Sequence, residues 1–163
     1  MSIGRRYISR DGLISVIITQ SCLSEMVKMC KTAHGNEIGS VLFGHYSVDG
    51  YSVFVDGTRP APVGSIGKRM SFWRSPRGLA SFFRRLFKKS NGGRYYIGEW
   101  HLHPGCSIAP SHCDDRTMTS ISKDHGSHGV VSIILGGRSC DDPLIGVSVY
   151  IGNSRVDLIE GRV

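Results

Sequence analysis

The stretch EWHLHPGCSIAPSHCD, residues 99–114, is the most informative part of the chain. It opens with the alternation of a β-strand, in which successive side chains point to opposite faces. His101 and His103 therefore share one face, while Trp100 and Leu102 share the other. Residues two apart on one face of a strand have Cα atoms about 6–7 Å apart. The two imidazoles can thus converge on a single metal ion.

The chain after this strand is expected to turn back toward it. Pro104 cannot donate a hydrogen bond to a sheet, so we expect the strand to end there. A loop over residues 104–110 then leads into a helix predicted over residues 111–124. Asp114 falls in the first turn of this helix, at the rim of the pocket that the two histidines would form.

Two histidines and one aspartate form a donor set that suits zinc. Zinc binds imidazole nitrogen and carboxylate oxygen at about 2.0–2.2 Å. Three protein ligands leave a fourth position for water, which is the arrangement of catalytic rather than structural zinc sites. Bound zinc lowers the pKa of that water to about 7 and polarises a substrate carbonyl. His101, His103 and Asp114 are therefore the candidate ligands of a hydrolytic zinc centre.

A hydrolytic centre also needs a proton acceptor and a group that stabilises the oxyanion. Glu37 and Glu99 are the two candidate bases, and Glu99 lies on the same predicted strand face as the histidines. Ser111 could donate a hydrogen bond to the oxyanion of a tetrahedral intermediate. Cys106 and Cys113 flank the site and could ligate a metal or form a disulfide, although free thiols are expected in a reducing compartment.

Simpler explanations exist for parts of this pattern. A pair of histidines on a strand is more often a surface pair than a metal site. Ser111 and Asp114 also match a capping box, in which a serine caps the helix and an acid three residues later bonds back to it. Capping does not account for two histidines at the end of the adjacent strand. The conjunction of strand, loop, capping box and upstream acid favours a metal centre.

Hydrophobic patterning predicts further elements on both sides of this segment. Strands are expected over residues 13–19, 38–46, 51–55, 94–103, 130–135, 145–151 and 156–159. Helical spacing of apolar residues predicts a helix over residues 22–34. Another helix is expected with Ser75 as N-cap and Pro76 at its first position, ending at Gly92-Gly93. Strands and helices alternate imperfectly, so we expect an α/β fold with a mixed central sheet and helices packed on both of its sides.

Length and composition restrict the class of protein. The 163 residues suffice for one domain with one core, and 40% hydrophobic with 20% charged residues is ordinary globular usage. No apolar run approaches the ~18 residues of a membrane helix, and the N-terminus lacks the apolar region of a secretory signal. Five cysteines without a CxxC pair disfavour a disulfide framework. We therefore expect a single-domain, soluble, cytoplasmic protein over residues 1–163.

The positive charge of the chain is concentrated in one segment. The net charge is +7, from 20 Lys and Arg against 13 Asp and Glu. Residues 64–94 hold nine basic side chains and no acidic one, which leaves 11 basic and 13 acidic groups elsewhere. Such a segment can meet nucleic acid or an acidic protein surface, or simply keep the chain soluble. We interpret it as a basic helical insertion that docks an acidic substrate or partner.

The segment from His101 to Asp114 resembles the HxHP-x6-SxxD signature of the JAB/JAMM (MPN+) metalloproteases. The upstream stretch EIGSVLFG, residues 37–44, resembles the ExGGxLxG-like strand of that family. The resemblance implies that His101 and His103 bind zinc together with Asp114, that Glu37 is the acid/base, and that Ser111 assists the oxyanion. It also implies a cytidine-deaminase-like fold.

Two residues near the signature, Leu102 and Glu99, bear on this resemblance. Leu102 stands where the family usually has Ser or Thr, and its side chain is expected to face away from the zinc. The family places its base on the earlier strand, so Glu99 is expected to orient a histidine through a hydrogen bond instead of acting as the base.

The short length and the phrase YIGEWH, residues 96–101, resemble the prokaryotic JAB branch most. Members of that branch include deubiquitinase-like peptidases encoded with E1-like and E2-like proteins, among them those of CBASS anti-phage systems. The resemblance implies a hydrolase, a zinc peptidase or isopeptidase. Its expected substrate is a ubiquitin-like protein or a conjugated nucleotidyltransferase, cleaved after its C-terminal glycine. A nucleic-acid partner and a membrane are not expected. The alternatives are a RadC-type DNA-associated protein and a peptidase that processes a sulfur-carrier protein.

Overall fold

The computed structural model describes residues 3–105, 107–125 and 128–161. Its first strands and helices are β1 (Ile3–Ser9), β2 (Ser15–Thr19), α1 (Gln20–Cys30), β3 (Gly39–Tyr46) and β4 (Ser52–Thr58). An inserted segment holds β5 (Ile66–Lys68), β6 (Ser71–Trp73) and α2 (Leu79–Lys89). The chain continues with β7 (Tyr95–Leu102), α3 (His112–His125), β8 (Val130–Gly136), β9 (Leu144–Ile151) and β10 (Ser154–Gly161). The seven strands expected from the sequence are all present.

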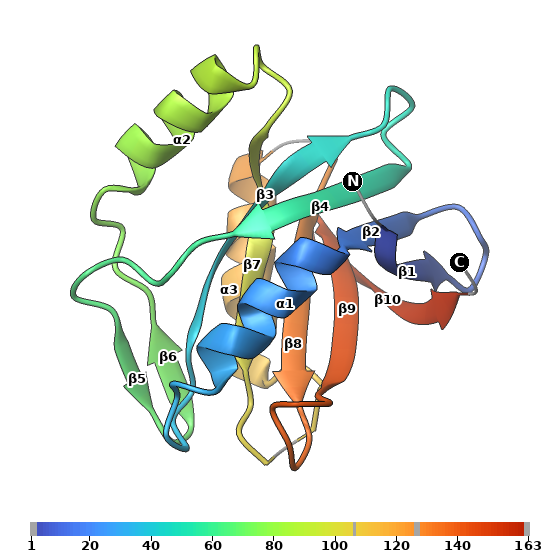
Figure 1. The fold of residues 1–163 in the computed structure, drawn as a ribbon. Coiled ribbons are helices and arrows are strands. Elements are labelled where there is room, and N and C mark those ends of the chain that lie inside the picture. The colour runs from blue at the N-terminus through green and yellow to red at the C-terminus, as the bar shows by residue number, and fades with distance from the viewer. Residues whose placement is uncertain (1–2, 106, 126–127, 162–163) are drawn as a thin grey trace.

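Eight of the strands form one mixed sheet, in the order β1-β10-β9-β8-β7-β3-β4-β2 (Figure 1). The pairs β2–β4 and β7–β8 are parallel, and the other pairs are antiparallel. The α/β class with a mixed sheet is thus as expected. The sheet also closes into a barrel because β1 pairs with both β2 and β10. The expectation of a central sheet layered between helices did not include this closure, since β1 was not predicted from the sequence.

Helices α1 and α3 pack against opposite faces of the sheet. Neighbouring residues of a strand point to opposite faces, and Val149 belongs to the main core while Tyr150 belongs to a second cluster. Helix α1 buries Cys22 and Met26 in the main core, and α3 buries Met118 against Tyr150. Helix α1 ends at Cys30, before the expected end at residue 34, and the chain then makes turns up to Asn36. None of the helices in the described part of the chain is both long enough and apolar enough to cross a membrane.

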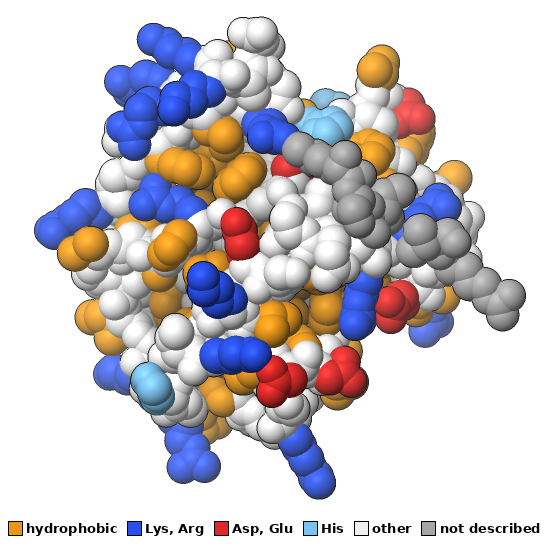
Figure 2. All heavy atoms as spheres, viewed as in Figure 1, with side chains coloured by type: hydrophobic (Ala, Val, Ile, Leu, Met, Phe, Trp, Pro, Cys, Tyr) orange, Lys and Arg blue, Asp and Glu red, His pale blue; other side chains and the backbone are white. Residues whose placement is uncertain are grey.

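The inserted segment between β4 and β7 differs from the expectation. Its first part is a hairpin, β5–β6, where only a loop was expected. The N-cap of α2 is Gly78 in the left-handed conformation, not Ser75. The Ser75 hydroxyl instead accepts a hydrogen bond from the backbone N–H of Arg77 within the preceding turn. Helix α2 has no fully buried residue, and Figure 2 shows Lys and Arg side chains gathered over it at one corner of the molecule.

The pairing of β3 with β7 places the upstream acid next to the histidines. The strands are antiparallel, with Gly39 opposite His101. The backbone N–H of Leu102 donates to the carbonyl of Ile38 at 2.7 Å, so the chain before β3 runs beside the end of β7. A Cβ on Gly39 would lie 2.3 Å from the carbonyl oxygen of Trp100, so only glycine allows this close approach. Glu37, two residues before Gly39, therefore lies near the end of β7.

Candidate metal centre and active site

The end of β7 presents the two histidines as the alternation predicts. Trp100 and Leu102 are buried in the main core, on the face that α1 covers. His101 and His103 point to the opposite face, where they line a cavity between the hairpin and α3. Leu102, the departure from the family signature, therefore faces away from the candidate metal ligands, as expected.

Helix α3 carries Asp114 in its first turn, and a capping box fixes the position of this turn. The backbone N–H of Ser111 donates to Asp114 Oδ2 at 2.7 Å, and the backbone N–H of Asp114 donates to Ser111 Oγ at 3.2 Å. The capping explanation and the metal explanation are thus compatible, because the same carboxylate also faces the histidines. A serine hydroxyl that accepts one hydrogen bond keeps its own O–H to donate. Ser111, which lines the cavity, retains this donor.

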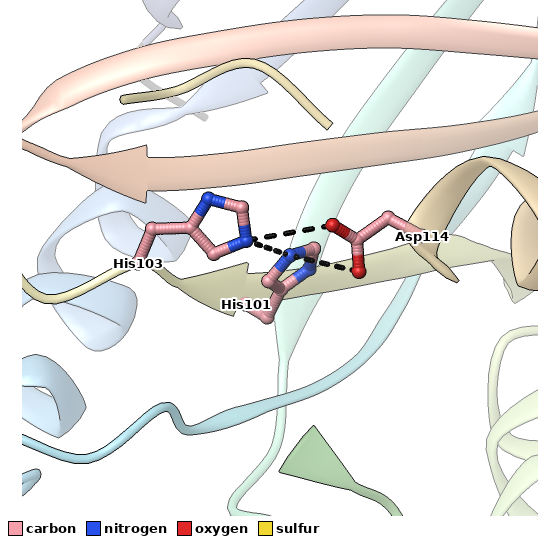
Figure 3. A group of neighbouring side chains, drawn as sticks. All are labelled: His101, His103 and Asp114. Atoms are coloured by element: carbon pink, nitrogen blue, oxygen red, sulfur yellow. Dashed lines mark hydrogen bonds and ion pairs between the residues drawn. The ribbon is translucent and has the colours of Figure 1, made fainter. Parts of the chain in front are cut away.

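The three candidate ligands converge on one point (Figure 3). One ligand atom from each of His101, His103 and Asp114 lies within 4.8 Å of the others. The two histidine Nε2 atoms are 2.9 Å apart, and each lies 3.5 Å from an oxygen of Asp114. Two ligands bound tetrahedrally to one zinc ion at 2.0–2.1 Å are about 3.3 Å apart. The observed separations lie on either side of this value, so the donor set and its spacing fit a metal ion.

The charge of Asp114 and the hydrogen bonding of His103 suit metal binding. Burial alone would raise the pKa of the Asp114 carboxyl, but its contacts with His101 and His103 hold that pKa well below its ordinary value. Asp114 is therefore ionised at neutral pH. The contact with Asp114 raises the pKa of His103, with burial acting in the opposite direction. The ring Nδ1 of His103 lies 3.0 Å from the carbonyl oxygen of Ser107. An N–H at Nδ1 donating to this carbonyl leaves Nε2 free to bind a metal.

Glu37 lines the same cavity as the two histidines. Burial raises the pKa of its carboxyl, while His103 and His101 act in the opposite direction. A carboxylate with a raised pKa is a better proton acceptor near neutral pH than an ordinary one. Glu37 contributes none of the three clustered ligand atoms. Its carboxylate therefore does not have to bind the metal and can exchange a proton.

Glu99, the other candidate base, is held in an ion pair. Arg74 donates to both of its carboxylate oxygens, at 2.9 Å from Nε and 2.5 Å from Nη2. The hydroxyl of Tyr96 donates to Glu99 Oε1 at 3.1 Å. A carboxylate bound at both oxygens by a guanidinium is a poor proton acceptor. Sequence reasoning missed Arg74, because it lies 25 residues from Glu99 and no local pattern links the two.

The cavity at these residues has a volume of about 660 Å³. One wall is the β5–β6 hairpin with Trp73, and the opposite wall is α3 with Met118 and Ile121. Cys113 also lines it as an exposed free thiol. Cys106, the other cysteine expected near the site, lies outside the described residues. The cavity is thus polar at the three clustered ligands and largely apolar between the hairpin and α3.

Comparison with known families gives one match that covers most of the chain. The model of the family described as prokaryotic homologs of the JAB domain matches residues 19–152. A curated relative from Enterobacter hormaechei subsp. hoffmannii (strain UCI 50), named CD-NTase/cGAS isopeptidase, is 37% identical over 145 residues. The aligned region covers 88% of this chain and 79% of that relative.

A solved structure is similar in fold. A protein from Desulfitobacterium hafniense, whose structure was determined in solution, superposes with a TM-score of 0.62. The match covers 88% of each chain at 18% sequence identity. At this identity the likeness concerns the fold alone.

Proposed function

The chain belongs to the family of prokaryotic homologues of the JAB domain, and from this premise we propose that it is a zinc-dependent isopeptidase. The proposed reaction is hydrolysis of the bond that follows the C-terminal glycine of a ubiquitin-like or conjugated protein. The observation that carries the proposal is the convergence of His101, His103 and Asp114 within 4.8 Å, in a cavity that Glu37 also lines.

We assign the metal ligands to the three converging side chains. His101 and His103 would hold zinc through Nε2, and Asp114 through its carboxylate. When bound there, zinc supplies Lewis acidity: it lowers the pKa of a water molecule and polarises a carbonyl oxygen. The hydrogen bond of His103 to Ser107 and the capping box at Ser111 help to fix the orientation of two of these ligands.

Glu37 is assigned the role of acid and base. Its carboxylate accepts a proton from the attacking water and then returns it to the nitrogen of the leaving amine. Its raised pKa and its place in the cavity beside the ligands support this role. The ion pair with Arg74 supports a different role for Glu99, which is to hold strand β7 against the inserted segment.

Ser111 is assigned to the oxyanion. Its hydroxyl oxygen accepts the cap hydrogen bond from Asp114, so its O–H can donate to the oxygen that becomes negative during the reaction. The helix turn that carries Ser111 also carries Asp114, which keeps the donor at a fixed distance from the metal ligands.

The name of the curated relative supports a nucleotidyltransferase conjugate as the substrate. That relative is a CD-NTase/cGAS isopeptidase, and it is 37% identical to this chain. We therefore propose that this chain acts in a CBASS-type anti-phage system, in the cytoplasm, with E1-like and E2-like proteins as the enzymes that make the conjugate. The whole of residues 1–163 is proposed to be one JAB domain, because β1 and β10, outside the matched residues 19–152, complete its sheet.

The basic segment is proposed to bind an acidic face of the substrate or of a partner protein. Arg84, Arg85, Lys88 and Lys89 of α2 are all exposed. Two of the three aromatic rings of α2, Phe82 and Phe83, pack against rings of β3 and β7, and only Phe87 is exposed, so α2 offers no row of rings on which successive bases could stack. This packing favours a protein partner over the single-stranded nucleic acid that a DNA-associated protein would bind.

Cleavage of a defined conjugate tests the proposal. The substrate is a nucleotidyltransferase whose C-terminal glycine is joined to the lysine side chain of a reporter peptide, with a linear peptide fusion as the second substrate. We expect release of the reporter after the glycine, loss of activity after chelation, and recovery on addition of zinc. Cleavage that persists in a chelator, or at a different bond, would contradict the proposal.

A further inference from the structure

The β5–β6 hairpin touches the backbone of Glu37 on both sides of that residue. Glu37 lies between α1 and β3, outside any helix or strand. Its backbone N–H donates to the carbonyl oxygen of Lys68, in β5, at 2.8 Å. The carbonyl oxygen of Glu37 lies against Gly67, where a Cβ would be only 2.2 Å away. Lys68 thus binds the N–H of Glu37, and the neighbouring Gly67 packs closely against the carbonyl group of the same residue.

Gly67 is required by this close approach and not by its backbone conformation. Its φ does not lie in the left-handed region that favours glycine, and the atoms that a Cβ would meet are the carbonyl oxygen of Glu37 at 2.2 Å and its carbonyl carbon at 3.4 Å. Contacts under 3.0 Å with backbone atoms cannot be relieved by a side-chain rotation. Any larger residue at position 67 must therefore move Glu37 or the hairpin.

The hairpin itself is anchored at its base and at one flank. The backbone N–H of Ser75 donates to Ser65 Oγ at 3.0 Å, which joins the two ends of the hairpin segment. Arg74, directly after β6, binds Glu99 of β7 through two hydrogen bonds. Gly67 pairs with Phe72 across the hairpin, so the position of β5 depends on that of β6. The strand that carries His101 is in this way connected to the backbone of Glu37 through the hairpin.

We propose that the β5–β6 hairpin positions Glu37 relative to the histidines, with Gly67 as the positioning residue. The inference rests on the proposed role of Glu37 as acid and base. The hairpin acts on the rate of bond cleavage through the backbone of Glu37, in addition to forming a wall of the cavity. A displacement of about 1 Å at a reacting group can cost about 100-fold in rate.

The first test compares Gly67→Ala with Gly93→Ala. Gly93 follows α2, and a Cβ there would lie 3.1 Å from the carbonyl oxygen of Ser90, without reaching the cavity. We expect Gly67→Ala to lower kcat by at least about tenfold with a change in KM below about threefold. Metal content is expected to equal that of the wild type, and Gly93→Ala is expected to behave as the wild type. A wild-type kcat in Gly67→Ala, or a rise in KM alone, would overturn the proposal.

A double substitution separates positioning from a general structural effect. If Gly67 acts through Glu37, the addition of Gly67→Ala to Glu37→Gln removes no further activity. Additive losses would show that Gly67 acts independently of Glu37 and would overturn the proposal.

Amide hydrogen exchange supplies a readout that does not depend on any substrate. NMR of the labelled protein should show faster exchange of the Glu37 amide in Gly67→Ala than in Gly93→Ala, by at least about tenfold, because the bond to Lys68 is weakened. Unchanged protection of that amide would refute the positioning role. If the wild type cleaves no conjugate, the proposed function fails, and the exchange measurement still decides whether the hairpin holds Glu37.

Discussion

Replacement of Glu37 by alanine separates the acid/base role from the metal site. Glu37 lines the cavity but is not one of the three clustered ligand atoms, so the variant should keep its metal. General acid–base catalysis contributes about 10²–10⁴-fold, which corresponds to about 3–5 kcal/mol of transition-state stabilisation. We therefore expect kcat to fall by this factor while KM and metal content stay close to the wild-type values.

Glu99→Ala is the matched control, because it removes a carboxylate from the same cavity. The change deletes two hydrogen bonds from Arg74 and one from Tyr96, and it leaves a half-buried guanidinium without its partner. The side chains of Glu99 and Arg74 are 17% and 21% exposed, so the loss of stability should be about 2–3 kcal/mol. Thermal unfolding should show a Tm lower by about 5–10 °C, and turnover per folded molecule should fall by less than about tenfold, because the hairpin loses one of its anchors while the backbone contact of Lys68 with Glu37 remains.

The assay is reporter release under saturating and limiting substrate, together with zinc content for each variant. The assignment of the base predicts a loss of kcat in Glu37→Ala that is at least about tenfold greater than the loss in Glu99→Ala. The reverse ranking would refute it, and loss of zinc in Glu37→Ala would show that this carboxylate is a ligand.

Variants at three further places test other parts of the structure. Ser111→Ala should lower kcat by about 100-fold and stability by about 1 kcal/mol, whereas Ser111→Thr should retain most of both; equal kcat in the two variants would exclude the oxyanion role. Thr58→Val removes the acceptor of the Trp100 indole N–H and the donor to the carbonyl of Val41. Urea unfolding should therefore show a free energy of unfolding that is lower by about 1–3 kcal/mol, and activity should be retained at urea concentrations below the unfolding transition. Charge reversal on α2 should raise KM more than it lowers kcat, and this effect should weaken at high salt; an unchanged KM would exclude a docking role for the basic side chains Arg84, Arg85, Lys88 and Lys89.

The convergence of the candidate ligands could be predicted from the sequence because the pattern that determines it is local. The alternation at residues 100–103 sets which side chains share a face, and the spacing from Ser111 to Asp114 sets the helix start. The structure bears out both, with Leu102 in the core and the capping box formed. The position of Glu37 depends on strand pairing, and its recognition came from the family resemblance.

The remaining features arise from contacts between distant parts of the chain. Strand β1 has two adjacent arginines and little apolar alternation, and it is held by pairing with β2 and β10. The strands of the β5–β6 hairpin are three residues each, too short for a periodic signal. Ser75 is a good N-cap residue by type, but the chain turns once more before α2, and Gly78 takes that position. None of these outcomes is encoded within a single window of sequence.

Metal content of the purified protein bears on every step proposed for this site. Elemental mass spectrometry of the acid-digested protein should find about one zinc per chain in the wild type and in Glu37→Ala, and almost none in His101→Ala. Wild-type protein that contains no transition metal and takes up none on incubation with zinc would contradict the assignment of His101, His103 and Asp114 as ligands.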